Sequence, residues 1–120
     1  MADRVLFVSW GQTVRGAEER ALEVFNEALG ILGRKQQDGE IEKFDVVLLE
    51  PNSDLDGFIE IFGSAEQLAA LREDEEFLRN TIDAQLCVDR IAHTTGYCNE
   101  GIGRMITLYQ EAMAKVPQRA

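Results

Sequence analysis

The stretch Leu55-Asp56-Gly57-Phe58-Ile59-Glu60-Ile61-Phe62-Gly63 decides the fold of this chain. Turn residues precede it, and the glycine at its end leads directly into a helical pattern. Because successive side chains of a strand point to opposite sides, its two isoleucines share one face and its two phenylalanines share the other. A strand with large apolar groups on both faces needs cover on both sides. Glu60 is the only charged residue between the two glycines.

Length and charge limit the kinds of partner. The 120 residues suit a single domain, 1–120, with one core. Twelve Lys and Arg against 22 Asp and Glu give a net charge of −10, which repels nucleic-acid phosphates and anionic membrane surfaces. No apolar run approaches the roughly 20 residues that span a bilayer, and the N-terminus lacks the features of a signal peptide. We therefore expect a cytoplasmic protein with no nucleic-acid or membrane partner.

The two cysteines, Cys87 and Cys98, do not have a metal-binding or redox spacing. An extended segment is predicted between them, which holds their α-carbons farther apart than a disulfide allows. Two free thiols are therefore expected.

Hydrophobic periodicity and turn residues divide the chain into seven elements. A capping box, Ser64-Ala65-Glu66-Gln67, begins the second helical region, and the acidic run after Arg72 predicts a break near Glu73. The short polar connection after Pro51 predicts an antiparallel hairpin. Strands are expected at about 4–10, 43–50, 58–62 and 90–98, and helices at about 17–35, 65–88 and 101–115.

The order of these elements predicts an α+β fold of the ferredoxin-like βαββαβ type with an extra C-terminal helix. Right-handed crossovers place the four strands in one antiparallel sheet and both crossover helices on the same face. In this arrangement the fourth strand neighbours the first, and the first neighbours the third.

The other face of the predicted sheet is apolar as well, since Val5, Phe7, Phe58 and Phe62 lie on it. A soluble monomer rarely exposes such a patch. The C-terminal helix is one possible cover, and a second copy of the sheet is another. We expect a sheet-to-sheet homodimer, because twofold dimers are the commonest oligomers. The C-terminal helix has an apolar stripe that we interpret as a packing face: Ile102, Met105, Ile106, Tyr109 and Met113.

The element order, the two-sided strands, the capped and interrupted second helix and the appended helix resemble the dimeric α+β barrel superfamily over about residues 4–98. In that superfamily two ferredoxin-like sheets pack face to face, often with a pocket between sheet and helices. Its members include cofactor-independent monooxygenases, haem-degrading enzymes and small-ring isomerases. The resemblance implies a homodimer that binds a small apolar or aromatic molecule, with monooxygenase-type or isomerase-type activity as its catalytic function. The Asn, Trp and His that act together in the haem-degrading branch are not matched here, since no Asn lies in the first strand.

Two residues are candidates for catalysis. His93 is the only histidine, and an imidazole titrates near neutral pH, so it suits a ligand or general base; a half-buried strand residue is the alternative. Glu60 lies between phenylalanines, where an unpaired carboxylate is costly to bury. It is expected either to line a wet pocket or to pair with an arginine, which the partner copy of a dimer could supply.

A polar set on the strands is the candidate ligand-binding site: Ser9, Glu60, His93 and Tyr97. His93 and Glu60 can act on one substrate only if they share a sheet face, with the first strand between them. The alternative is a non-catalytic dimeric module in which these polar residues only fix the interface.

No cofactor motif is present, and no metal site is predicted. The loop Asn52-Ser53-Asp54-Leu55-Asp56-Gly57 resembles the start of a calcium loop, but Gly63 stands where the closing glutamate belongs. A hairpin turn is the simpler interpretation.

Overall fold

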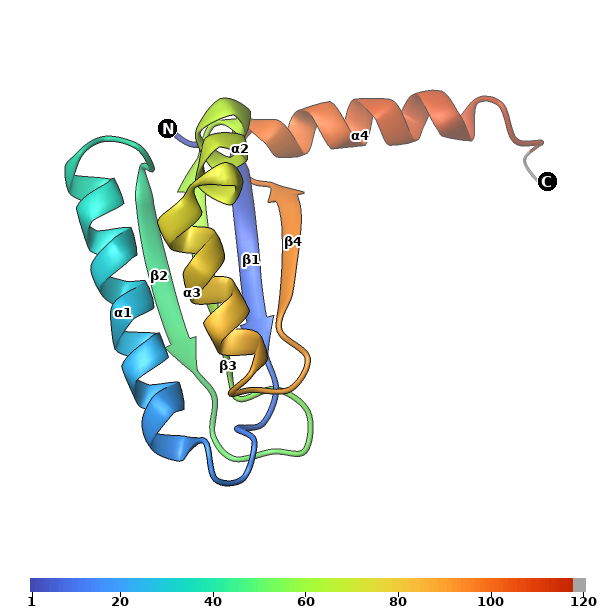
Figure 1. Ribbon diagram of the computed structural model, residues 1–120. Helices are drawn as coiled ribbons and strands as arrows, with labels where there is room; N and C mark the ends of the chain where they lie inside the picture. The colour runs from blue at the N-terminus through green and yellow to red at the C-terminus, as the bar shows by residue number, and fades with distance from the viewer. Residues whose placement is uncertain (118–120) are drawn as a thin grey trace.

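Four strands form one antiparallel sheet in the order β2-β3-β1-β4 in the computed structural model, which describes residues 1–117. The strand order is the predicted one. The strands are β1 (Arg4–Trp10), β2 (Lys43–Leu48), β3 (Gly57–Gly63) and β4 (Ala92–Tyr97). The helices are α1 (Glu18–Gln37), α2 (Ala65–Glu73), α3 (Glu75–Gln85) and α4 (Glu100–Met113), as Figure 1 shows.

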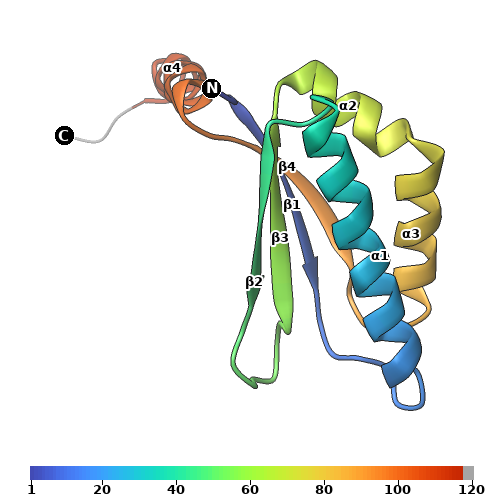
Figure 2. The same cartoon turned by 90° about the vertical axis from the view of Figure 1, so that its left-hand side faces the viewer.

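The core lies between the sheet and helices α1, α2 and α3, which all cover the same face of the sheet (Figure 2). Leu6 of β1 stands opposite Ile61 of β3, and Val8 stands opposite Ile59. These four side chains are buried, and Leu32 of α1 packs against the same cluster. The isoleucines of β3 therefore meet the helices.

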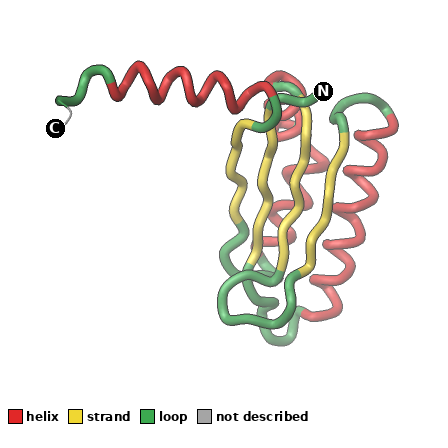
Figure 3. Tube along the Cα trace, turned by 180° about the vertical axis from the view of Figure 1, so that it is seen from behind, coloured by secondary structure: helices red, strands yellow, loops and turns green. Residues whose placement is uncertain are grey.

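The other face of the sheet, called the open face below, is not covered by any helix (Figure 3). In β3 it holds Glu60 and the two phenylalanines, and Phe58 packs on Phe7 with ring centroids 5.0 Å apart. The strand registers assign twelve residues to it: Val5, Phe7, Ser9, Lys43, Asp45, Val47, Phe58, Glu60, Phe62, Ala92, Thr94 and Gly96.

The helical region after β3 is interrupted at Asp74, as the acidic run predicts. Asp74 ends α2 and begins α3, with extended backbone (φ −64°, ψ 126°). Its carboxylate accepts a hydrogen bond from the Phe77 N–H and lies 2.8 Å from the Lys35 Nζ of α1. Lys35 first, and then the Phe77 N–H, lower the pKa of Asp74. The capping box at Ser64 and Gln67 is also present, in both directions.

Replacement of Asp74 by Ala should lower the free energy of unfolding by about 1–2 kcal/mol, because the first turn of α3 loses its cap. Asp74→Asn keeps an oxygen for the Phe77 N–H and should lose less. Glu73→Ala, at an exposed neighbour, should change stability by less than about 0.5 kcal/mol. Urea unfolding measures all three. If Asp74→Ala and Asp74→Asn lowered the free energy of unfolding equally, the hydrogen bond from the Phe77 N–H would not contribute to stability.

Helix α4 does not cover the open face, so that possible cover from the sequence is wrong for this chain. It runs away from the sheet past β4 (Figures 1 and 3) and touches its own domain only near its first turn. In one chain Ile102, Met105, Ile106 and Tyr109 of its apolar stripe are exposed, so the predicted packing face is not buried against its own domain. Within residues 1–117, no helix has the length and hydropathy of a membrane span.

Candidate functional site

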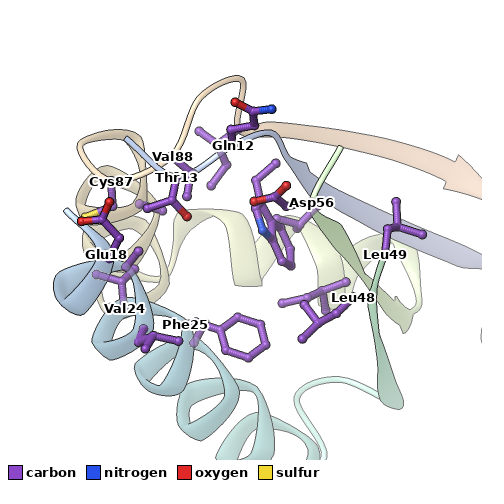
Figure 4. A pocket seen from close by; sticks show the side chains of 18 of the residues that line it. Gln12, Thr13, Glu18, Val24, Phe25, Leu48, Leu49, Asp56, Cys87 and Val88 are labelled. Carbon is purple, nitrogen blue, oxygen red and sulfur yellow. The ribbon is translucent and has the colours of Figure 1, made fainter. Parts of the chain in front are cut away.

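A cavity of about 680 Å³ lies between the helices and the sheet, near the end of β1. It is lined mainly by apolar side chains from four elements: Val8 and Trp10 of β1, Ala21, Leu22, Phe25 and Ala28 of α1, Leu48 of β2 and Ile59 of β3. Helix α3 and the loops before α1, before β3 and after α3 supply the rest of its wall. Figure 4 shows Phe25 and Leu48 facing each other across this space. Its volume falls in the range of small-molecule sites.

Two aromatic rings form one side of the cavity. Trp10 and Phe25 pack with ring centroids 6.0 Å apart at an angle of 58°. Trp10 stands opposite Gly57 in the sheet, and a β-carbon at position 57 would lie 2.9 Å from the indole ring and 2.7 Å from the Val47 carbonyl. Only glycine leaves room for the indole at this place, so the turn glycine of the hairpin also positions the tryptophan.

The three loops around the cavity are tied to one another. Arg90 of the loop after α3 donates hydrogen bonds to the carboxylate and the backbone carbonyl of Asp54 in the β2–β3 hairpin. The Asp89 N–H donates to the Gln12 carbonyl, and the Gly11 N–H donates to the Asp89 carbonyl. These bonds fix the position of backbone segments that belong to no helix or strand.

The polar groups at the cavity are few. Asn80 of α3 is buried, and its Nδ2 donates to the Val24 carbonyl of α1 at 3.0 Å, which joins the two helices. Glu18 accepts a hydrogen bond from the Gly16 N–H with each carboxylate oxygen. Asp56 of the hairpin is half-buried and lines the cavity. The cavity therefore combines an apolar body with carboxylates and amides at its wall.

The four residues predicted as a ligand-binding set are not brought together. Ser9 and Glu60 lie on the open face, whereas His93 and Tyr97 lie on the helix-covered face, because His93 stands opposite Val8 and Glu60 opposite Phe7. The condition for a His93–Glu60 pair, a shared face, is not met within one chain. None of the four lines the cavity. A ligand-binding or catalytic role for each of them stays a prediction.

His93 packs against Phe77 of the core with ring centroids 5.5 Å apart. Burial lowers its pKa, and the positive charge of Arg72 lowers it further. Tyr97 lies beside Arg4, whose guanidinium carbon is 4.2 Å from the phenol ring centre. In these two contacts, His93 packs on Phe77 and Tyr97 packs on Arg4.

The cavity residues were missed in the sequence because they come from loops and helices that are far apart along the chain. One feature of the sequence could have indicated the cavity: Trp10 is a large aromatic residue at the end of a strand, immediately before a glycine. Across the described part of the chain, no three His, Cys, Asp or Glu side chains are grouped closely enough to hold a metal ion. Cys87 and Cys98 are both free thiols, as predicted, and Cys87 lies at the cavity wall.

Comparison with known proteins supports the architecture. No protein-family model and no curated protein matches this chain. Among solved structures, a conserved protein of unknown function and possible oxidoreductase from Bacteroides thetaiotaomicron has a TM-score of 0.64 at 14% identity, over 82% of this chain and all of that one. A dimeric protein of unknown function with a ferredoxin-like fold from Bacteroides fragilis has a TM-score of 0.59 at 13% identity, with 79% and 96% covered.

A third similar structure is SnoaB, a cofactor-independent oxygenase from Streptomyces nogalater, with a TM-score of 0.55 at 17% identity over 82% of this chain and 95% of that one. The chain thus has a ferredoxin-like fold, as its element order predicts. At these identities the likeness shows the fold alone.

The buried His93 should make stability depend on pH. Its pKa is below that of the unfolded chain, about 6.5, so the unfolded chain takes up a proton first as the pH falls. The free energy of unfolding should therefore decrease as the pH falls below about 6.5, and should level off once the pKa of the folded state is passed. Urea unfolding of wild type and His93→Gln between about pH 7.5 and 5 isolates this contribution. A constant difference between the two proteins would contradict it.

Proposed function

We propose that this protein is a homodimer that binds a small, largely aromatic molecule in the cavity between sheet and helices. The observation that carries the proposal is the cavity of about 680 Å³ with Trp10 and Phe25 at its wall. Sites of this size, with an apolar lining and a few polar groups, are typical for small organic ligands.

The exposed rim of the cavity supports an apolar ligand. Leu22 of α1 and Leu48 of β2 line the cavity and are 66% and 65% exposed. A bound ring system would remove part of this surface from water, at about 25 cal/mol per Å² of apolar area. A polar substituent of the ligand would then face Asp56, Gln12 or Glu18.

The dimer is supported by the open face. Its phenylalanines and valines are half-buried in one chain, and no helix of the described residues covers this side of the sheet (Figure 3). One structural neighbour is described as dimeric. Sheet-to-sheet packing would bury both open faces and place Glu60 inside the interface, opposite Asp45 of β2, with Lys43, the ion-pair partner of Asp45, as the next residue of β2 on the same face.

Oxidation of the bound molecule is the activity that the neighbours suggest, since one is described as a cofactor-independent oxygenase and another as a possible oxidoreductase. One oxygenation whose atoms balance without a cofactor converts a substrate CH₂ group and O₂ to a carbonyl group and water. Its first step needs a base that removes a proton from the substrate. Among the cavity residues, Asp56 and Glu18 carry carboxylates, which can serve as a base of this kind.

Ligand binding can be read from Trp10, the only tryptophan of the chain. Titration with 1-hydroxyanthraquinone, a flat aromatic probe, should quench Trp10 fluorescence in a saturable way. Ala28→Phe, which places a ring in the cavity, should weaken binding at least tenfold (about 1.4 kcal/mol). Ala69→Phe, at an exposed position of α2, is the matched control and should leave binding unchanged. Equal affinity of all three proteins would place the probe elsewhere and contradict the proposal.

The dimer is checked by sedimentation equilibrium at micromolar concentration. Phe7→Glu, on the open face, should dissociate it, because a carboxylate would enter an apolar interface. Leu78→Glu, at an exposed leucine of α3 in the helix layer, should leave it intact. A monomeric wild-type protein would overturn this part of the proposal.

A further inference from the structure

The direction of α4 is set by its attachment to the N-terminal residues. Asn99, directly before the helix, has a positive φ of 50°, and its Nδ2 donates to the Ala2 carbonyl at 2.7 Å. The Cys98 N–H donates to the Asp3 carbonyl. A β-carbon at the buried Gly101 would lie 2.2 Å from the Asp3 carbonyl oxygen, so only glycine fits there. Three contacts and an unusual backbone conformation thus hold the start of α4 in one orientation.

This fixed helix presents an apolar stripe to the outside of its own domain. Ile102, Met105, Ile106 and Tyr109 recur at helical spacing and are between 45% and 68% exposed. The extended helix gives the chain a radius of gyration of 17.1 Å, whereas a compact domain of this length has about 14 Å. An amphipathic helix held away from its own core lacks the packing that usually stabilises such helices.

The position of α4 relates it to the open face. It lies on the side of the sheet away from α1, α2 and α3, as the end-on view of Figure 2 shows. A molecule packed on the open face would therefore occupy the same side as α4. The three similar solved structures described above align over 95% or more of their own length. They leave 18% to 21% of this chain without an aligned counterpart. The uncovered share is about as long as the segment after β4.

The charge of the segment favours a second copy as its partner. Between Glu100 and Pro117, two acidic residues are balanced by Arg104 and Lys115, whereas the whole chain has a net charge of −10. A neutral segment can approach an acidic copy of the same chain without strong repulsion. Two basic residues are few for an amphipathic helix that binds an anionic membrane surface.

We propose that α4 is an arm that each protomer extends onto a second copy of the chain, with the stripe of Ile102, Met105, Ile106 and Tyr109 packed against that copy. This proposal depends on the homodimer proposed above. The arm would extend the interface of that dimer beyond the two sheets. Because Asn99 and Gly101 hold the arm in place before association, little conformational entropy is lost when it docks.

Substitutions on the two sides of α4 test the arm. Ile106→Glu and Tyr109→Glu place a carboxylate on the stripe and should raise the dimer dissociation constant at least tenfold. Thr107→Glu adds the same charge on the polar side of the helix and should change it by less than about twofold. Sedimentation equilibrium measures all three full-length proteins. Circular dichroism should still show a folded domain in all three proteins, because no residue of α4 belongs to the core cluster.

A mixed sample locates the contact directly. Equal amounts of ¹³C,¹⁵N-labelled and unlabelled protein should give isotope-filtered NOEs between Tyr109 or Ile106 of one copy and residues of the other. NOEs from α4 to the open face of the same chain would overturn the arm, as would a dimer that is unaffected by the stripe variants. A wild-type monomer would instead overturn the dimer itself, so the two failures can be told apart.

Discussion

The alternation of isoleucine and phenylalanine along β3 is the constraint on which the rest of the structure depends. Ile59 and Ile61 require cover on one side, and Phe58 and Phe62 require it on the other. Helices α1, α2 and α3 satisfy only the first requirement. Among the described residues, α4 is the one helix after β4, and it runs away from the sheet. The fold is therefore complete on one face of the sheet and has large apolar groups without cover on the other.

The cavity depends on the same strand by a different route. Gly57, at the first position of β3, leaves space for the Trp10 indole, which in turn contacts Phe25 of α1. The hydrogen bonds between the Arg90 side chain and Asp54 hold the hairpin before β3 to the loop after α3. Contacts between distant parts of the sequence thus hold the walls of the cavity in place. Small-molecule sites are usually pre-formed in this way.

Local patterns and two-sided strands were enough to predict the element order, the strand order, the capping box and the break at Asp74. Those features rest on residues close in sequence or on simple alternation. The cavity rests on loop contacts between residues more than thirty positions apart, such as Arg90 and Asp54, which no spacing reveals. The polar set of Ser9, Glu60, His93 and Tyr97 was chosen for residue type alone, and the strand registers divide it between two faces. The direction of α4 depends on the carbonyls of Ala2 and Asp3, which carry no side-chain signature.

The two outer strands of the sheet differ in how well they resist uncontrolled strand addition. The edge strand β2 carries Lys43 and Asp45, and charges on an edge strand discourage pairing with another chain. The opposite edge, β4, has the sequence Ala-His-Thr-Thr-Gly-Tyr and no charged residue at neutral pH. Its length of six residues and the helix that leaves its end are the features that limit its use as a template for aggregation. The segment after β4 therefore bears on the solubility of the chain as well as on its contacts.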